Sequence, residues 1–320
     1  MATVVLTDFA WPDDSIERSV IEGAGHQLVA GPSTPEPAHA IAALVARYDP
    51  QAIMTCWAQV DATAIEAPGD LRIVQRIGVG LDNIDVAAAT DRGAWVANVP
   101  DYCVDEVADH AVALLLDWAR GTVMFDRQVK SGRWDPTAAQ LRRVADLTIG
   151  IVGYGRIGRG TATRLRAFGC NILVFNRSAA RDDRVEQVAL DSLLERSHVV
   201  ILHAPLNAET HHLINAARLH RMRAGAFLIN VSRGPLIDND ALIAALETGH
   251  LSGAGLDVIE GEPDPPRALV ERTDVIVTPH VAFSSDASLA DLRRRAAEEV
   301  VRVLAGISPH FPCNDPKGMS

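Results

Sequence analysis

Short apolar runs alternate with longer amphipathic stretches through the first third of the chain. The apolar runs have the length and composition of strands, and the stretches between them repeat apolar residues at helical spacing. The predicted strands are residues 3–6, 27–30, 52–55, 71–77 and 94–98, and the predicted helices are residues 13–24 and 36–47. Strands that alternate with helices are typical of a parallel sheet covered by helices. We therefore predict that residues 1–99 form an α/β domain.

A long helix is predicted between Asp101 and Gly121. Asp101 can cap its start, and the acidic residues Asp105 and Glu106 favour the first turn of a helix. Apolar residues then recur at i, i+3 and i+4 until Gly121 ends the pattern. We interpret this helix as the link between two domains. The segment 122–146 has no clear period, and we expect an irregular arm that packs over a neighbour.

The alternation of strands and helices resumes after residue 147. The strands predicted there are residues 147–152, 171–175, 198–203, 226–230, 253–258 and 274–278. Six strands are enough for a doubly wound parallel sheet, so residues 100–282 are predicted to form a second domain. Residues 288–304 read as an amphipathic helix, and a Pro-rich irregular tail follows. We assign residues 283–320 to the first domain.

A glycine-rich turn separates the first strand of the second domain from the helix that follows. Residues 147–159 read LTIGIVGYGRIGR, in which Gly153, Gly155 and Gly158 have GxGxxG spacing. In a dinucleotide site the first glycine makes the turn, the second lets the pyrophosphate approach, and the third lets the helix pack on the strand. An ordinary glycine turn is the alternative. Because a second strand follows at the expected distance, we favour dinucleotide binding.

The residues that follow that second strand, 171–175, indicate which dinucleotide is bound. Where a carboxylate would receive the adenosine ribose 2′-hydroxyl, the sequence has Asn176, Arg177 and Ser178. These side chains can donate hydrogen bonds to a 2′-phosphate, and the arginine can do so with charge assistance. A solvated turn is the alternative. We therefore favour NADP(H), with NAD(H) as the second possibility.

Three side chains with complementary chemistry follow predicted strands. Arg233 can hold a carboxylate and polarise a carbonyl, since its planar fork is always charged. His280 can exchange a proton near neutral pH, and Glu262 can fix the tautomer of its ring. Each residue taken alone is more often structural. Their position beyond the strands of one cofactor sheet favours a catalytic set.

A second glycine turn lies in the first domain. Gly78, Val79 and Gly80 follow its fourth strand, and their backbone N–H groups could hold an anion. A plain turn between a strand and a helix is the alternative.

Metal and cysteine chemistry are not expected. His203, His211 and His212 lack helical i, i+4 spacing, and no carboxylate accompanies them at ligand distance in sequence, so no metal is predicted. Cys103 has Asp101 and Asp105 as neighbours, which disfavour a thiolate.

Composition limits the possible partners. The 320 residues carry a net charge of −11, and no run of lysine and arginine would build a nucleic-acid surface. The first residues lack the basic region of a signal peptide, and no apolar run approaches the length of a membrane span. The expected location is the cytoplasm, with no nucleic-acid or membrane partner.

The motifs of this chain resemble those of the D-isomer-specific 2-hydroxyacid dehydrogenases. They occur in the family's order as GVGLDNID, NVPDYCVDEVADHA, TIGIVGYGRIGR, LHAPLNAETHHLI, LINVSRGPLIDNDALIAAL, GAGLDVIEGEP and TPHVAF. The resemblance implies a Rossmann-type domain and a smaller flavodoxin-like α/β substrate domain. It implies that Arg233, Glu262 and His280 are catalytic, that the backbone of residues 78–80 receives the substrate carboxylate, and that Asp257 contacts the nicotinamide. Further cofactor contacts are implied for Arg156, Ile157, His203, Pro205, Val231 and Ser232.

The expected activity is hydride transfer between NAD(P)H and C2 of a small 2-keto or 2-hydroxy acid of the D series. Within the family, VADH and HVAFSSDAS most resemble the branch that contains the C-terminal-binding proteins. The alternatives are a corepressor-like protein that senses NAD(P), and a related dehydrogenase that acts on formate or phosphite. The resemblance also implies a homodimer. The apolar residues of the 122–146 arm agree with this expectation, because they would otherwise face water.

Overall fold

The computed structural model describes residues 1–138, 140–180 and 182–316. The chain divides into two compact units: unit 1 is residues 1–102 and 285–320, and unit 2 is residues 103–284. The last four residues of the predicted tail, 317–320, lie outside the described residues. The sequence placed the domain boundaries after residues 99 and 282.

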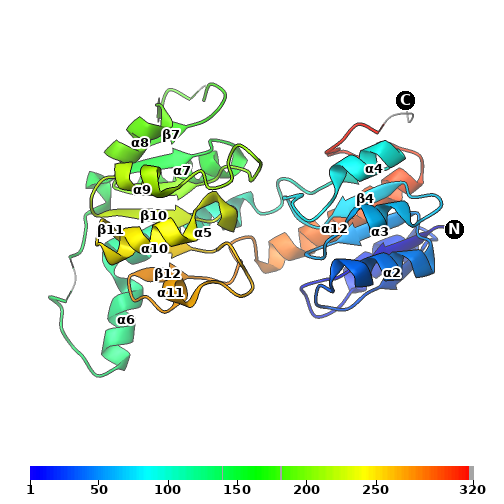
Figure 1. The fold of residues 1–320 in the computed structure, drawn as a ribbon, viewed down its shortest axis with the longest axis horizontal. Coiled ribbons are helices and arrows are strands. Elements are labelled where there is room, and N and C mark those ends of the chain that lie inside the picture. The colour runs from blue at the N-terminus through cyan, green and yellow to red at the C-terminus, as the bar shows by residue number, and fades with distance from the viewer. Residues whose placement is uncertain (139, 181, 317–320) are drawn as a thin grey trace. The chain divides into compact units, whose positions relative to one another are not determined.

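Unit 1 contains a five-stranded parallel sheet with the order β2-β1-β3-β4-β5. Its elements are β1 (Thr3–Leu6), α1 (Ser15–Gly23), β2 (Gln27–Ala30), α2 (Ala38–Tyr48), β3 (Ala52–Thr55), α3 (Ala62–Glu66), β4 (Ile73–Arg76), α4 (Val86–Arg92), β5 (Trp95–Ala97) and α12 (Asp286–Leu304). This is the flavodoxin-like order. Helices α2, α3 and α4 cover one face of the sheet and α1 and α12 the other, each over its own apolar core (Figure 1).

The C-terminal helix α12 is anchored in unit 1 by a buried ion pair. Arg293 on α12 donates from Nε and Nη2 to the carboxylate of Glu17 on α1, at 2.9 and 2.7 Å. Glu17 is fully buried, and a buried carboxylate needs such a partner. Ser285 and Ser288 form a capping box at the start of the helix. The two ends of the chain therefore build one unit.

Unit 2 contains a parallel sheet with the order β12-β11-β10-β9-β6-β7-β8. Its strands are β6 (Thr148–Val152), β7 (Asn171–Phe175), β8 (Glu186–Gln187), β9 (Val199–Leu202), β10 (Ala226–Asn230), β11 (Leu251–Leu256) and β12 (Val275–Val277). The predicted Rossmann-type doubly wound fold is confirmed. The expected count of six strands was wrong, because β8 is an exposed edge strand of two residues that leaves no apolar run in the sequence.

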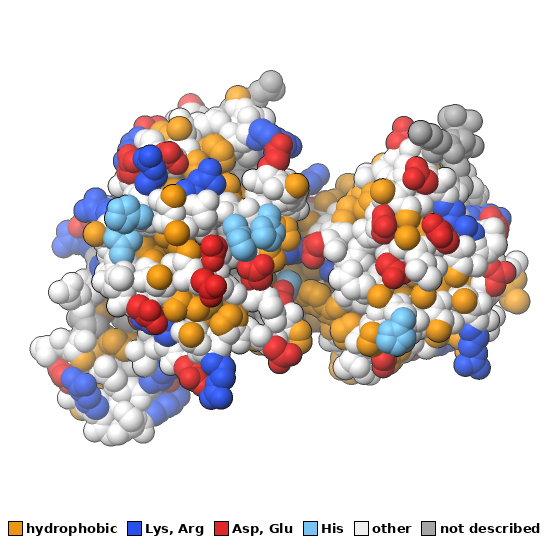
Figure 2. Space-filling model, viewed as in Figure 1, with side chains coloured by type: hydrophobic (Ala, Val, Ile, Leu, Met, Phe, Trp, Pro, Cys, Tyr) orange, Lys and Arg blue, Asp and Glu red, His pale blue; other side chains and the backbone are white. Residues whose placement is uncertain are grey.

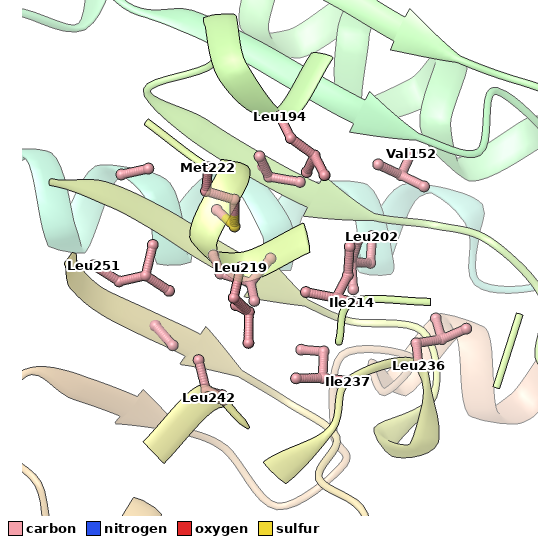
Figure 3. Close-up of a cluster of buried hydrophobic side chains, with 14 of the residues drawn as sticks. Val152, Leu194, Leu202, Ile214, Leu219, Met222, Leu236, Ile237, Leu242 and Leu251 are labelled. Carbon is pink, nitrogen blue, oxygen red and sulfur yellow. The ribbon is translucent and has the colours of Figure 1, made fainter. Parts of the chain in front are cut away.

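Helices cover both faces of this sheet (Figure 1). One face carries α8 (Leu190–Arg196), α9 (Ala216–Arg221) and α10 (Asn239–Glu247), and the other carries α5 (Val104–Arg120) and α7 (Arg156–Ala167). Unit 2 also contains three short helices, η1 (Val144–Asp146), η2 (Gly234–Leu236) and α11 (Arg267–Val270). Figure 3 shows the main core, in which Leu202 of β9 and Leu251 of β11 pack with Leu194, Leu219 and Leu242 of the three covering helices. This packing fixes the strand ends, from which the functional loops start.

The expectation of a wholly irregular arm over 122–146 was wrong in its first part. Helix α6 (Thr122–Lys130) begins directly after Gly121, which ends α5 in the left-handed conformation with a φ of 64°. None of the residues of α6 is buried, and its nine residues are fewer than the roughly 11 to 18 over which a helical period is recognised. An i, i+4 pair between Asp126 and Lys130, at 2.8 Å, supports it locally.

The surface that Figure 2 shows mixes acidic, basic and apolar side chains on each unit. Within the part of the chain that the structure describes, no helix is both long enough and apolar enough to cross a membrane.

Candidate active site

The glycine-rich turn after β6 has three glycines in three different surroundings. A Cβ on Gly153, which has a φ of 97°, would lie 2.7 Å from the carbonyl of His203. A Cβ on Gly158 would lie 2.2 Å from the carbonyl oxygen of Gly153, so helix and strand touch there. Gly155 has open space where its Cβ would be. The outer glycines are therefore required by packing, whereas the middle one leaves room for a ligand.

Helix α7 starts at this open space. Its first two residues are Arg156, which is exposed, and Ile157, which is half-buried. The first N–H groups of a helix have no intrahelical partner, and together with the helix dipole they favour a phosphate. The turn follows β6, and the strand order of the sheet reverses between β6 and its neighbour β9. Ligands of doubly wound sheets bind at that point, so the residues present fit a dinucleotide.

The residues after β7 surround the same turn. Asn176 accepts a hydrogen bond from the backbone N–H of Tyr154 through Oδ1 at 3.1 Å. Its amide nitrogen donates to the carbonyl and the hydroxyl of Ser178, at 3.1 and 3.0 Å. The side chain of Arg177 is 90% exposed, and the carboxylate of Glu209 lies 4.0 Å from it. This arginine is therefore available to an incoming anion.

The remaining predicted cofactor residues lie at the ends of β9 and β10. His203 is held through Nε2 by the hydroxyl of Thr161 on α7, at 3.0 Å, and burial lowers the pKa of His203 to about 3. Its imidazole is therefore neutral near pH 7. Pro205 is exposed, and Val231 is buried. Ser232 donates from Oγ to the carbonyl of Ala204 at 2.6 Å, which joins the two loops.

His280 and Glu262 form a hydrogen-bonded pair. Nδ1 of the imidazole lies 2.9 Å from Oε1 of the carboxylate, although 18 residues separate the two in sequence. The side chains are 19% and 39% exposed, so a solute can reach the pair. His280 has a φ of 53°, a left-handed conformation that carries strain for most residues other than glycine. Such strain persists only where the surroundings enforce it, and it is typical of active sites.

Asp257 enforces the conformation of the loop that carries His280. Its buried carboxylate accepts hydrogen bonds from the hydroxyl of Thr278 at 2.6 Å and from the backbone N–H groups of Val281 and Ala282 at 2.9 and 3.0 Å. Its backbone carbonyl accepts from the N–H of His280 at 2.8 Å. The side chain is thus occupied with the loop, and its contact with the nicotinamide stays a prediction.

Two residues that the sequence did not single out support this loop. Nε2 of His110 on α5 lies 2.9 Å from the hydroxyl of Thr278 and 3.7 Å from Asp257. His110 lies in the VADH motif and Thr278 in the TPHVAF motif. Their motifs were visible in the sequence, but the contact between them joins residues that are 168 positions apart.

Arg233 follows β10 on a loop that Asn230 organises. The buried amide of Asn230 donates to the carbonyl of Arg233 at 2.8 Å and accepts from the N–H of Ser232 at 3.1 Å. A Cβ on the next residue, Gly234, would lie 2.2 Å from the carbonyl carbon of Ile259. The loop of Arg233 therefore lies directly against the segment that leads to Glu262.

The glycine turn of residues 78–80, which is predicted to hold an anion, lies in unit 1. Gly78 has a φ of 152°, and its Cβ would collide with the guanidinium of Arg76 at 2.6 Å. The carbonyl of Val79 accepts a hydrogen bond from Asn98 Nδ2 at 2.6 Å. Gly80 is half-buried. Arg76 is 6% exposed, and its Nε has no hydrogen-bond partner among the described residues. Sequence reasoning missed this arginine because it lies inside an apolar strand.

Comparisons with known proteins agree with this arrangement. The family model described as "D-isomer specific 2-hydroxyacid dehydrogenase, NAD binding domain" matches residues 112–282, a range that contains Arg233, Glu262 and His280. A glyoxylate reductase of Korarchaeum cryptofilum is 42% identical over 260 residues, which are 78% of each chain.

Solved structures resemble the whole chain. The crystal structure of a glyoxylate reductase from Paecilomyes thermophila has a TM-score of 0.89 at 27% identity and covers 98% of each chain. An acyclic imino acid reductase in complex with NADPH and D-Arg has a TM-score of 0.86 at 25% identity, over 98% of this chain and 100% of that one. The chain therefore belongs to the D-isomer-specific 2-hydroxyacid dehydrogenase family and is an NAD(P)-dependent oxidoreductase.

Proposed function

We propose that the protein reduces a small 2-keto acid of the glyoxylate class to the 2-hydroxy acid, with Arg233, Glu262 and His280 as its catalytic set. The hydrogen-bonded pair of Glu262 and His280 is the observation that carries this proposal. The glyoxylate reductase relatives support the substrate class. When bound, the nicotinamide supplies the hydride, or accepts it in the reverse direction.

His280 would move the proton. Glu262 would accept the Nδ1 hydrogen across the 2.9 Å contact, which leaves Nε2 for the substrate oxygen. In reduction, Nε2–H donates its proton to the carbonyl oxygen as that oxygen gains charge. In oxidation, the neutral Nε2 accepts the hydroxyl proton. The enforced loop geometry holds the ring in place for both steps.

Arg233 would hold the acid and polarise its carbonyl. Its fork can donate two parallel hydrogen bonds to a carboxylate, which fixes the orientation of C2. Gly78, Val79 and Gly80 remain proposed ligands of the substrate carboxylate. The proposed reaction needs no metal, because Arg233 and His280 supply the positive charge.

A panel of acids tests the function. Purified protein is assayed by NAD(P)H absorbance with glyoxylate, hydroxypyruvate, pyruvate and longer 2-keto acids, and with formate and phosphite in the oxidising direction. We expect the highest kcat/KM for a small 2-keto acid. Turnover of formate or phosphite alone, or of no substrate despite NAD(P)H binding, would contradict the proposal and favour the two alternatives.

We further propose that NADPH is preferred to NADH through Arg177, Asn176 and Ser178. A charge-assisted contact with the 2′-phosphate contributes about 1.5 to 3 kcal/mol, or roughly a tenfold to hundredfold preference. Asn176→Asp combined with Arg177→Ala should reverse it. An aspartate can still accept the N–H of Tyr154, as Asn176 does, and it repels the phosphate.

The measurement is kcat/KM for both cofactors at low and high salt, because the exposed contact should weaken as salt increases. Arg196→Ala is a matched control, since that arginine is exposed and pairs only with the exposed Glu186 among the described carboxylates. A wild-type preference for NADH would show that Arg177 is only a surface residue.

A homodimer is also proposed. Val129, Trp134 and Leu141 of the 122–146 arm are 47%, 85% and 43% exposed. Helix α6 extends from unit 2 in Figure 1 and has no buried residue. Burial of these apolar side chains against a second copy would remove them from water. Light scattering at micromolar concentration should give the mass of a dimer, and the mass of one chain would contradict it.

A further inference from the structure

Two adjacent histidines meet a carboxylate on the surface of unit 2. Nε2 of His212 lies 2.9 Å from Oε2 of Glu260, and Nε2 of His211 lies 3.9 Å from Oε1. The two imidazole centroids are 4.0 Å apart. One potential ligand atom of each residue lies within 4.8 Å of the others. The sequence offers these histidines no carboxylate at ligand spacing, and the fold brings Glu260 to them although it is 48 residues away from His212.

The backbone presents the three side chains together. His212 has a φ of 48°, and its N–H donates to the carbonyl of Pro235 at 2.8 Å. The carbonyl of Glu260 accepts from Asn239 Nδ2 at 2.9 Å. The segment of Glu260 is also pressed against Gly234, where a Cβ would meet the nitrogen of Glu260 at 2.3 Å. Both sides of the cluster are therefore fixed by contacts outside it.

We propose that His211, His212 and Glu260 form a site for a divalent transition metal, with Zn²⁺ as the ion that fits best. Imidazole nitrogens and a carboxylate suit Zn²⁺, Ni²⁺ and Co²⁺ better than Ca²⁺ or Mg²⁺. Ligand atoms of a tetrahedral Zn²⁺ site lie about 3.4 Å apart. The two imidazole nitrogens lie 2.9 and 3.9 Å from different oxygens of the Glu260 carboxylate, and one ligand atom of each residue lies within 4.8 Å of the others, so side-chain rotations would bring the three to that spacing.

The three side chains of the proposed metal site are partly exposed, so solvent can supply a further ligand. The side chains of His211, His212 and Glu260 are 53%, 35% and 34% exposed, so water can complete the coordination. Histidine and acidic side chains lie next to one another on the face of unit 2 that Figure 2 shows. The site is separate from the proposed acid–base pair, because the carboxylate of Glu262 faces His280 instead. The inference thus goes beyond the proposed function.

Titration of the full-length protein, freed of any affinity tag and treated with a chelator, tests the site. We expect Co²⁺ to bind at one site per chain with visible absorption bands, and Zn²⁺ to displace it. His211→Ala and Glu260→Gln should each weaken Co²⁺ binding at least tenfold. Zn²⁺ should also raise the Tm of the wild type but not that of His211→Ala. Circular dichroism checks that both variants are folded.

His220→Ala is the matched control. His220 is exposed and stacks on His250 with centroids 5.7 Å apart, which gives a second histidine pair, and the variant should bind Co²⁺ like the wild type. Equal Co²⁺ affinity in the wild type, His211→Ala and Glu260→Gln would overturn the assignment. Absence of any Co²⁺ band in the wild type at millimolar Co²⁺ would overturn it as well. Loss of binding in His220→Ala alone would move the site to the other pair.

Discussion

Replacement of His280 by glutamine is expected to lower kcat by about 100-fold or more, the usual scale for the loss of a positioned acid–base group. Glutamine keeps a polar side chain but cannot take up and release a proton near neutral pH. Because His280 has a φ of 53°, His280→Asn should be made beside it, since asparagine tolerates this backbone conformation. Steady-state kinetics with the preferred acid measures the loss.

Cofactor affinity separates a catalytic role from a structural one. Fluorescence titration should give an NAD(P)H dissociation constant near that of the wild type for both His280 variants, because the glycine-rich turn lies on another loop. His220→Ala, which changes an exposed histidine elsewhere in unit 2, should keep full turnover. Wild-type kcat in His280→Asn would exclude His280 as the proton donor.

Arg233→Ala should lower kcat/KM by about 100- to 1,000-fold, because it removes both the carboxylate anchor and a donor to the developing oxyanion. Arg233→Lys should recover only part of that loss. A lysine ammonium carries the charge but cannot form the two parallel hydrogen bonds of the guanidinium. The measurement is kcat and KM for all three proteins at saturating cofactor.

A surface arginine provides the comparison for the lysine variant. Arg221 is 51% exposed and pairs with Glu195 at 2.9 Å, so Arg221→Lys should leave kcat and KM unchanged. If Arg233→Lys also has the kcat and KM of the wild type, then Arg233 acts only as a counter-ion. The proposal that its guanidinium anchors the carboxylate through two hydrogen bonds would then be wrong.

The two sheets were predictable because buried parallel strands leave continuous apolar runs in sequence. The run before Gly153 and the spacing of Gly153, Gly155 and Gly158 likewise identified the strand, turn and helix of the nucleotide site. Strand β8 and helix α6 were missed for the opposite reason. Neither contains a buried residue, and at two and nine residues both are too short for a period to be recognised in the sequence.

The contacts that hold the candidate site are long-range and were not predictable from local pattern. Asp257 reads only as an acidic residue after a strand, yet its carboxylate organises the loop of His280 some 20 residues later. Glu260 meets the histidine pair across 48 residues of sequence, and its segment packs so closely on Gly234 that a Cβ there would not fit. The branch within the family and the cofactor preference stay predictions.

The order of the two units along the chain has an evolutionary consequence. Unit 1 is assembled from both ends of the chain, whereas unit 2 is one uninterrupted stretch, residues 103–284. Arg233, Glu262 and His280 all lie in that stretch, together with Asp257, which holds the loop of His280. A single genetic crossover on each side of the stretch would transfer the whole set intact. The flanking segments could then diverge, or be exchanged with those of a relative, without separating the proposed proton donor from its supports.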